Sequence, residues 1–137
     1  MLTVVNDYPP NYELLKQTFK IADNILFCYG HTLYNPSGCY IDPIVMKHEE
    51  VHEKQQGDDP EKWWQRYLVD SAFRFCQELE AYAHQYKEIK KKFKDKNTQV
   101  RMLNTLAADL SSPNYGSICS HQEALMSIKD NIKFKVK

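Results

Sequence analysis

The most constraining feature of this chain is a stretch of helix-forming residues that lies between a clear start signal and a clear stop signal. Asp42 followed by Pro43 is a favourable helix start, because aspartate caps free backbone N–H groups and proline suits the first helical position. Gly57, followed by Asp58-Asp59-Pro60, is an equally clear stop. The sequence therefore predicts a helix from Pro43 to Gln56.

The middle of this helix reads His48-Glu49-Glu50-Val51-His52, an H-E-x-x-H pattern. Two histidines at positions i and i+4 project from one face of a helix, about one turn apart. At that spacing both imidazoles reach a single tetrahedral zinc ion, and Glu49 stands close to any water on the metal, where it can act as a general base. The alternative is a solvated helix on which two histidines happen to lie one turn apart. The flanking signals favour the metal site.

A metal site of this kind needs a third protein ligand, and the chain beyond Pro60 offers several acidic residues. If one helix doubled back directly from Pro60, a residue near Asp70 would lie level with the histidines, and Glu78 would overshoot by about 12 Å. If residues 61–69 instead form a separate short helix, Asp70 or Ser71 can cap a new helix that brings Glu78 to the metal. We take the second arrangement, and Asp70 remains open as a competitor.

The segment Glu78-Leu79-Glu80-Ala81-Tyr82 matches an E-x-x-A-[D/Y] pattern downstream of the H-E-x-x-H helix. With this segment, the chain resembles a small gluzincin-type zincin metallopeptidase, and more narrowly small uncharacterised phage-encoded proteins of the H-E-x-x-H type. The resemblance implies that Glu78, and not Glu80, is the third zinc ligand. The lysine-rich end of this helical stretch continues well beyond what the zincin pattern requires. Further matching residues lie within about 25–128, at 33–38, 55–56, 63–67, 73–74 and 113–116.

The sequence as a whole predicts one α+β domain. We expect a mainly helical, zincin-like fold with a small antiparallel hairpin beside the metal-binding helix. At 137 residues it can bury one core. Ile25–Tyr34 is rich in aromatic and β-branched residues and is interrupted by Gly30, a predicted bulge. Residues 35–38 predict a turn, after which Cys39–Ile41 returns as a short strand. In zincin-like enzymes an edge strand here pairs with extended substrate, so Gly30–Tyr34 is a candidate peptide-binding edge. A purely structural hairpin is an equal alternative.

Five further segments have a predicted structure. Helical spacing predicts helices at Asn11–Asp23 and Thr98–Leu110. Ser120 and Glu123 have the spacing of a capping box, which predicts a helix to about Ile128. The alternating tail at 132–136 is either a strand or frayed. Residues 87–96 hold six lysines, which is typical of a solvated helix face.

Composition excludes several classes of partner. Eighteen basic and eighteen acidic residues give a net charge of zero, which argues against a nucleic-acid-binding protein. The sequence has no apolar run of about 18 residues and no basic segment leading into an apolar one, so we expect neither a membrane span nor a signal peptide. We therefore expect a cytosolic protein, or a virion-associated one if it is phage-encoded. The four cysteines form no Cys-x-x-Cys pair, and Cys28 and Cys76 are interpreted as small buried apolar residues.

Two residues outside the ligand set are candidates for supporting roles. Tyr115 lies in a predicted loop and is a candidate oxyanion donor above the metal, with packing on the preceding helix as the alternative. Arg74, one turn before Glu78, is a candidate to orient its carboxylate, with an ion pair to Asp70 as the alternative. The isolated histidines, at 31, 84 and 121, are interpreted as surface residues.

Two functions remain open at the level of sequence. The first is a zinc metallopeptidase that cleaves a peptide or protein substrate with Glu49 as general base. The second is a non-catalytic zinc protein, such as a phage structural or host-interaction module. Short length favours the second, whereas Glu49 favours the first, because a structural zinc site needs no base. We favour the peptidase, and the sequence does not give its oligomeric state.

Overall fold

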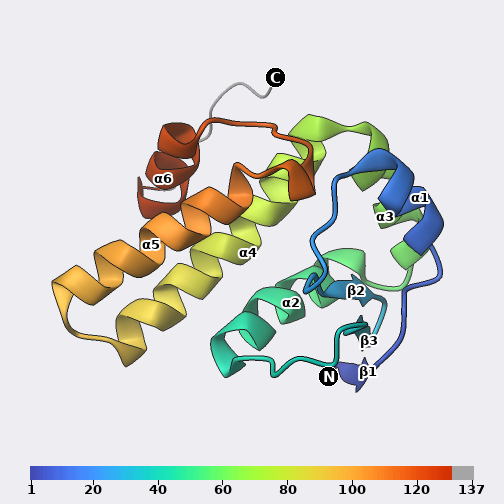
Figure 1. Ribbon diagram of the computed structural model, residues 1–137, viewed down its shortest axis with the longest axis horizontal. Coiled ribbons are helices and arrows are strands. Elements are labelled where there is room, and N and C mark those ends of the chain that lie inside the picture. The colour runs from blue at the N-terminus through green and yellow to red at the C-terminus, as the bar shows by residue number, and fades with distance from the viewer. Residues whose placement is uncertain (131–137) are drawn as a thin grey trace.

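The computed structural model describes residues 1–130, which form a mainly helical α+β fold with a small mixed sheet (Figure 1). This confirms the predicted α+β, mainly helical fold class. The tail at 132–136 lies outside the described residues. In chain order the elements are β1 (Thr3–Val5), α1 (Tyr12–Thr18), β2 (Phe27–Tyr29), β3 (Thr32–Tyr34), α2 (Pro43–Gln56), α3 (Pro60–Val69), α4 (Ser71–Lys92), α5 (Lys96–Leu110), the 3₁₀ turn η1 (Pro113–Tyr115) and α6 (His121–Asp130).

Helix α2 has the bounds that its flanking signals predict. The Asp42 carboxylate accepts a 2.8 Å hydrogen bond from the backbone N–H of Ile44, and Pro43 occupies the first turn. Gly57 ends the helix with a φ of 56°, a left-handed value that glycine adopts without strain. These local interactions place the H-E-x-x-H residues in the middle of a regular helix.

The chain does not double back from Pro60 in one helix. It forms the short helix α3 and then breaks at Asp70, whose carboxylate accepts a 3.0 Å hydrogen bond from the N–H of Phe73 and so caps α4. Asp70 also lies 3.4 Å from Nε of Arg66. The competing hypothesis of Asp70 as a ligand is therefore wrong, because this residue acts as a helix cap. The break gives α4 its own direction, along α2 (Figure 1).

The sheet differs from the predicted hairpin. Gly30, with a φ of 65°, makes the tight turn between β2 and β3 instead of a bulge, and Cys39–Ile41 is not a strand. The strand order is β1-β3-β2, with β1 parallel to β3. Both edges of β3 are thus paired, so the prediction that Gly30–Tyr34 forms a peptide-binding edge is wrong. The sequence signals missed β1, whose pairing with β3 joins distant parts of the chain.

The remaining elements follow local capping signals. Helix α1 is shorter than predicted, and α5 begins before Thr98 because Asp95 accepts a 3.0 Å hydrogen bond from the Thr98 N–H. Ser120 and Glu123 form the predicted capping box at α6. All four cysteines are free, and the structure buries Cys28 as predicted, whereas Cys76 is partly exposed.

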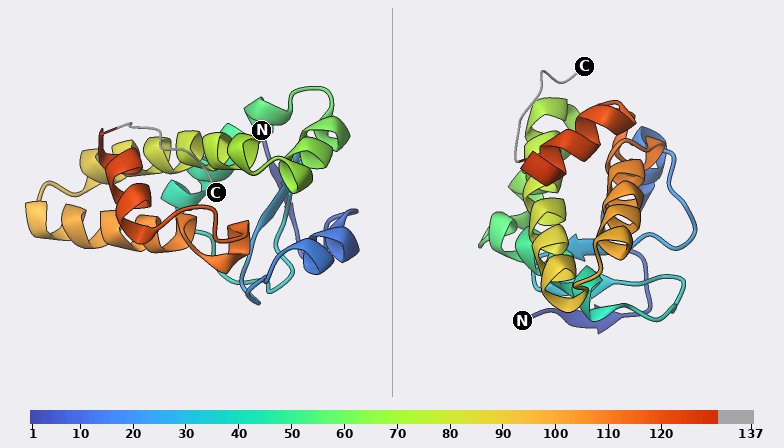
Figure 2. Two further views of the ribbon diagram at one scale, coloured as in Figure 1. Left: turned by 90° about the horizontal axis from the view of Figure 1, so that it is seen from above. Right: turned by 90° about the vertical axis from the view of Figure 1, so that its left-hand side faces the viewer.

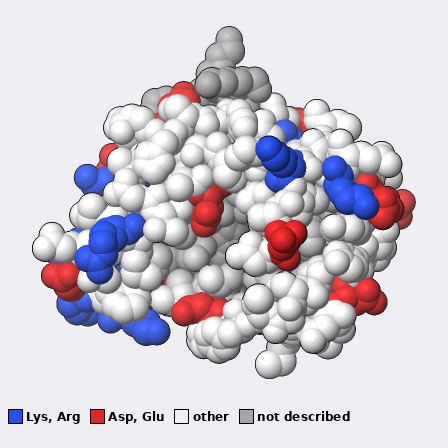
Figure 3. Space-filling view, in the orientation of Figure 1, with Lys and Arg blue, Asp and Glu red and all other residues white. Residues whose placement is uncertain are grey.

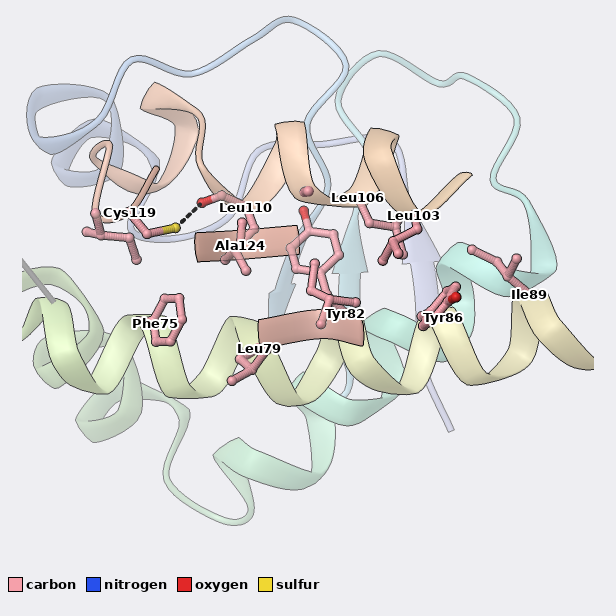
Figure 4. Close-up of a cluster of buried hydrophobic side chains, with 13 residues drawn as sticks. Phe75, Leu79, Tyr82, Tyr86, Ile89, Leu103, Leu106, Leu110, Cys119 and Ala124 are labelled. Atoms are coloured by element: carbon pink, nitrogen blue, oxygen red, sulfur yellow. Dashed lines mark hydrogen bonds between the residues drawn. The ribbon is translucent and has the colours of Figure 1, made fainter. Parts of the chain in front are cut away.

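Two hydrophobic clusters hold the elements together. One lies among α4, α5 and α6, where α5 runs alongside α4 (Figures 2 and 4). The other joins α1, β2 and α3 through Leu15, Phe19, Phe27, Trp63, Trp64 and Tyr67. Helix α4 contributes to the first cluster and α3 to the second, and α2 contacts both of these helices. Among residues 1–130, no helix combines the length and the apolar character needed to cross a lipid bilayer.

Candidate metal centre

The packing of α2 along α4 brings the three predicted ligands together. His48 and His52 are one turn apart on α2, and Glu78 faces them from α4. Nε2 of His48 lies 3.4 Å from one carboxylate oxygen of Glu78, and Nε2 of His52 lies 3.2 Å from the other. One ligand atom from each residue lies within 4.8 Å of the other two, and all three side chains are buried. This group can hold a metal ion.

The second nitrogen of each imidazole is held by a glutamine. Nδ1 of His48 lies 2.9 Å from Oε1 of Gln85, and Nδ1 of His52 lies 2.8 Å from Oε1 of Gln55. Because an amide oxygen only accepts, each Nδ1 carries the proton and donates it. This leaves both Nε2 atoms directed at Glu78. Metal-binding histidines are characteristically oriented in this way.

The Glu78 carboxylate provides a test of whether a cation fits. Its Oε2 accepts a 2.7 Å hydrogen bond from the hydroxyl of Tyr67. Its Oε1 is buried and makes no hydrogen bond among the described residues, and its neighbour is Nε2 of His48 at 3.4 Å. An unpartnered buried carboxylate oxygen is costly unless a cation approaches it. Two imidazoles and a carboxylate are ligands that suit a divalent transition metal, so the residues fit such an ion.

Without metal, the same residues form an ion pair. Burial alone would lower the pKa of His52, but the adjacent Glu78 carboxylate raises it to about 9. Burial opposes ionisation of Glu78, yet His52 and His48 hold the pKa of this carboxyl well below its usual range. A metal ion therefore competes with a proton for Nε2 of His52.

Glu49 is the acid that the motif places beside the ligands. Its side chain is buried, with 7% of the residue exposed, and it lines the same cavity as both histidines. Burial raises the pKa of Glu49, the imidazoles of His48 and His52 lower it, and Glu78 raises it, with a net upward shift. The structure thus holds a further carboxyl group next to the three potential ligands.

A cavity of about 500 Å³ opens beside these residues. Its polar lining includes His48, Glu49, His52, Glu78 and Asp109. Segments that are distant in the sequence complete its wall, including residues 24–28, residues 39–42 and the last two residues of η1. A cavity of this size accommodates a small organic ligand.

Tyr115 lines this cavity together with a second tyrosine, Tyr82. Its hydroxyl lies 2.7 Å from that of Tyr82, whose ring packs edge-on against His48 at a centroid distance of 4.4 Å. Burial raises the pKa of both tyrosines well above the ordinary value, so both keep their protons. The structure therefore places Tyr115 on the cavity wall with Tyr82 next to the first histidine.

Arg74 has different partners from those that its spacing suggests. Its guanidinium donates hydrogen bonds to the backbone carbonyls of Tyr67, at 2.5 Å, and Tyr115, at 2.9 Å. It also lies 4.8 Å from the ring centroid of Phe19. The predicted contact with Glu78 is replaced by these interactions, and Arg66 takes the predicted alternative partner, Asp70. Arg74 thus connects α1, α3 and η1.

Other candidate residues lie outside the ligand group. Glu80 accepts a 3.1 Å hydrogen bond from Nε2 of Gln55 and so supports His52 indirectly. Gln56 hydrogen-bonds Gly30 and the carbonyl of Cys28, which fixes β2 against α2. The isolated histidines pair elsewhere: His31 with Glu53, His84 with Glu88 and His121 with Asn104.

Three contributors to the site were missed by sequence reasoning. Tyr82 and Gln85 follow Glu78 by four and seven positions, so they share one face of α4. That spacing is a signal that could have identified both. Tyr67 lies on α3, and no local pattern indicates that its hydroxyl reaches Glu78.

Comparisons with known proteins identify no relative of this chain. No protein-family model, curated protein or solved structure matches the chain. The interpretation of the site therefore rests on its own geometry and chemistry.

Proposed function

We propose that this protein is a zinc-dependent metallopeptidase of the gluzincin type. The observation that carries the proposal is the burial of Glu49 beside His48, His52 and Glu78 in the wall of a cavity. The burial of a carboxyl group is costly, and a metal that only stabilises the fold does not need one next to its ligands. A hydrolytic site needs this arrangement of a base, a metal and a space for substrate.

Zinc is the metal that this ligand set favours. Two histidines and one glutamate, with an adjoining cavity in place of a fourth ligand, match the pattern of catalytic zinc sites, whereas structural sites are closed by four protein ligands. Within residues 1–130, the potential metal-binding group consists of these three residues. When bound, zinc supplies Lewis acidity that activates water and polarises a carbonyl group.

The residues of the chain then divide the remaining chemistry. The Glu49 carboxylate accepts a proton from the attacking water, whose oxygen adds to the carbonyl carbon of the scissile amide. The C–N bond breaks, and Glu49 returns the proton to the departing amine nitrogen. The products are one carboxyl group and one amine. The hydrogen-bonded hydroxyls of Tyr82 and Tyr115 are the candidate donors to the developing oxyanion, with Tyr115 the residue that the sequence selects.

The experiment that tests the proposal compares two neighbouring glutamates. Glu49→Gln keeps the size of the side chain and removes its basicity, so zinc content should persist while peptide cleavage falls at least about 100-fold. Glu50→Gln is the matched control, because Glu50 is only partly buried and pairs with Lys47 at 3.8 Å. It should retain full activity.

Zinc content of untagged protein and cleavage of a mixed peptide library are the two measurements. A protein that takes up no zinc, or a zinc-loaded wild type that leaves the library intact, would contradict the proposal. The second result would favour the non-catalytic zinc protein instead.

A further inference from the structure

The cavity has an apolar wall that neither hydrophobic cluster accounts for. Leu26, Ile41 and Val45 line it, each is partly exposed, and none belongs to the two core clusters. Val45 precedes Glu49 by four positions on α2, so it lies one turn away on the same helix face. Apolar side chains in such a position provide a contact surface for an apolar group next to the buried carboxylate.

The charged residues of the cavity wall are acidic or are histidines. Asp42, Glu49, Glu78 and Asp109 contribute carboxyl groups, and the described lining contains no lysine or arginine. Figure 3 shows a hollow near the centre of one face, with acidic side chains at its border. Outside the group of His48, His52 and Glu78, an acidic side chain of a ligand would therefore lack a basic side chain to pair with and would face like charge.

The strands next to the cavity do not offer a free edge to an extended polypeptide. Both edges of β3 are paired, by β1 and β2. On β2, the carbonyl of Cys28 accepts hydrogen bonds from Nε2 of Gln56, at 2.7 Å, and from Nε1 of Trp64, at 3.1 Å. Side chains thus occupy the backbone acceptor that an added strand would use.

We propose that the cavity takes a short, non-acidic amide with a bulky apolar side chain, and not the interior of an extended polypeptide. This inference rests on the proposed function, whose substrate it narrows to small peptides or chain ends. A cavity of about 500 Å³ holds a few residues at most. Leu26, Ile41 and Val45 contact the apolar side chain of the ligand, and the acidic lining disfavours acidic side chains in the ligand.

Calorimetric titration of the zinc-loaded full chain tests this with N-acetyl-Leu-Phe-amide as the probe. N-acetyl-Leu-Glu-amide and N-acetyl-Glu-Phe-amide are the acidic comparisons, and a blocked decapeptide with Leu-Phe at its centre is the extended one. We expect the apolar probe to bind at least about tenfold more tightly than each of the other three, a difference of at least about 1.4 kcal/mol.

Substitutions then assign the binding to the cavity wall. Val45→Trp fills the space along the apolar wall and should weaken probe binding at least about tenfold. Val100→Trp is the matched control, because Val100 is a helical valine with 55% exposure that does not line the cavity. Ile41→Ser, in the irregular segment before α2, is the second test and leaves the helix intact. Melting temperatures establish that each variant is folded.

The outcomes separate this inference from the proposed function. Tighter binding of the apolar probe that is lost in Val45→Trp and Ile41→Ser supports the inference. If the same protein cleaves no probe, only the peptidase proposal fails. Equal or tighter binding of the acidic probes or of the decapeptide overturns the inference. A complete lack of probe binding, or probe binding that neither wall substitution changes, also overturns the inference. The peptidase proposal still stands in that case if the protein cleaves other peptides.

Discussion

The Nδ1 atom of His48 donates a 2.9 Å hydrogen bond to Oε1 of Gln85, which lies two turns beyond Glu78 on α4. Since Gln85 and Glu78 share one face of the helix, α4 contacts both sides of the same imidazole. The amide oxygen of Gln85 fixes the tautomer of His48, and the carboxylate of Glu78 lies next to Nε2, the other ring nitrogen. The site is thus preorganised by the packing of two helices.

Replacing Gln85 with leucine should weaken metal binding by about 10- to 100-fold, because the buried Nδ1–H of His48 loses its acceptor and its orientation. Gln99→Leu is the matched control, since Gln99 is buried and donates to the Phe93 carbonyl, outside the site, at 2.6 Å. That variant should lose stability and keep its affinity. Competition titration against a chromophoric chelator measures the zinc affinity of both variants. Equal affinity losses in the two variants would show that Gln85 acts only through the fold.

Glu78→Ala should reduce zinc affinity by several orders of magnitude, because it removes the carboxylate to which both histidines are directed. Glu80→Ala, on the same helix, should have a much smaller effect, limited to the lost hydrogen bond with Gln55. The same titration distinguishes the two. A larger loss in Glu80→Ala would mean that the ligand assignment is wrong.

Zinc affinity should rise by roughly tenfold for each pH unit between about pH 6.5 and about pH 9. The reason is that metal binding displaces the proton of His52, whose pKa in the metal-free site is about 9. The stability of the metal-free protein should change in the opposite direction. The pKa of His52 is raised by folding, so its ion pair stabilises the fold fully below about pH 6.5 and is lost as pH rises toward 9.

Melting temperatures measured with zinc and with chelator across this range test the linkage. The gap between the two curves should widen as pH rises. A gap that is constant with pH would show that zinc displaces no proton from the site.

Local signals explain why part of the site could be predicted from the sequence. Asp42, Pro43 and Gly57 act through hydrogen bonds and backbone angles within a few residues, so the bounds of α2 follow from the sequence directly. The break at Asp70 is similarly local, and it decides between the two paths considered for the following helix.

Interactions between distant segments explain what the sequence did not reveal. The pairing of β1 with β3 joins Val4 to Leu33, and it turns the expected edge strand into a central one. The hydrogen bond from Tyr67 to Glu78 likewise depends on how α3 packs against α4. Neither contact has a periodic signature, because each is set by tertiary packing.

Arg74→Lys should destabilise the protein by about 1.5–3 kcal/mol, because a lysine cannot reproduce the forked hydrogen bonds to the carbonyls of Tyr67 and Tyr115. Zinc affinity should change little, since Arg74 does not bond the ligands. Denaturant unfolding and metal titration measure the two effects separately. An affinity loss as large as that of Glu78→Ala would restore the sequence-based hypothesis that Arg74 orients the carboxylate.

Tyr115→Phe should lower the kcat for peptide cleavage by about 100-fold with little change in KM or zinc affinity, if its hydroxyl donates to the oxyanion as proposed. Tyr82→Phe removes the hydrogen-bonded partner at 2.7 Å and tests whether the donor is the neighbouring hydroxyl. Tyr86→Phe is the control, because Tyr86 is buried on α4 and does not line the cavity. A larger loss of kcat in Tyr82→Phe would reassign the role to Tyr82. Full activity in both variants would show that neither hydroxyl stabilises the oxyanion.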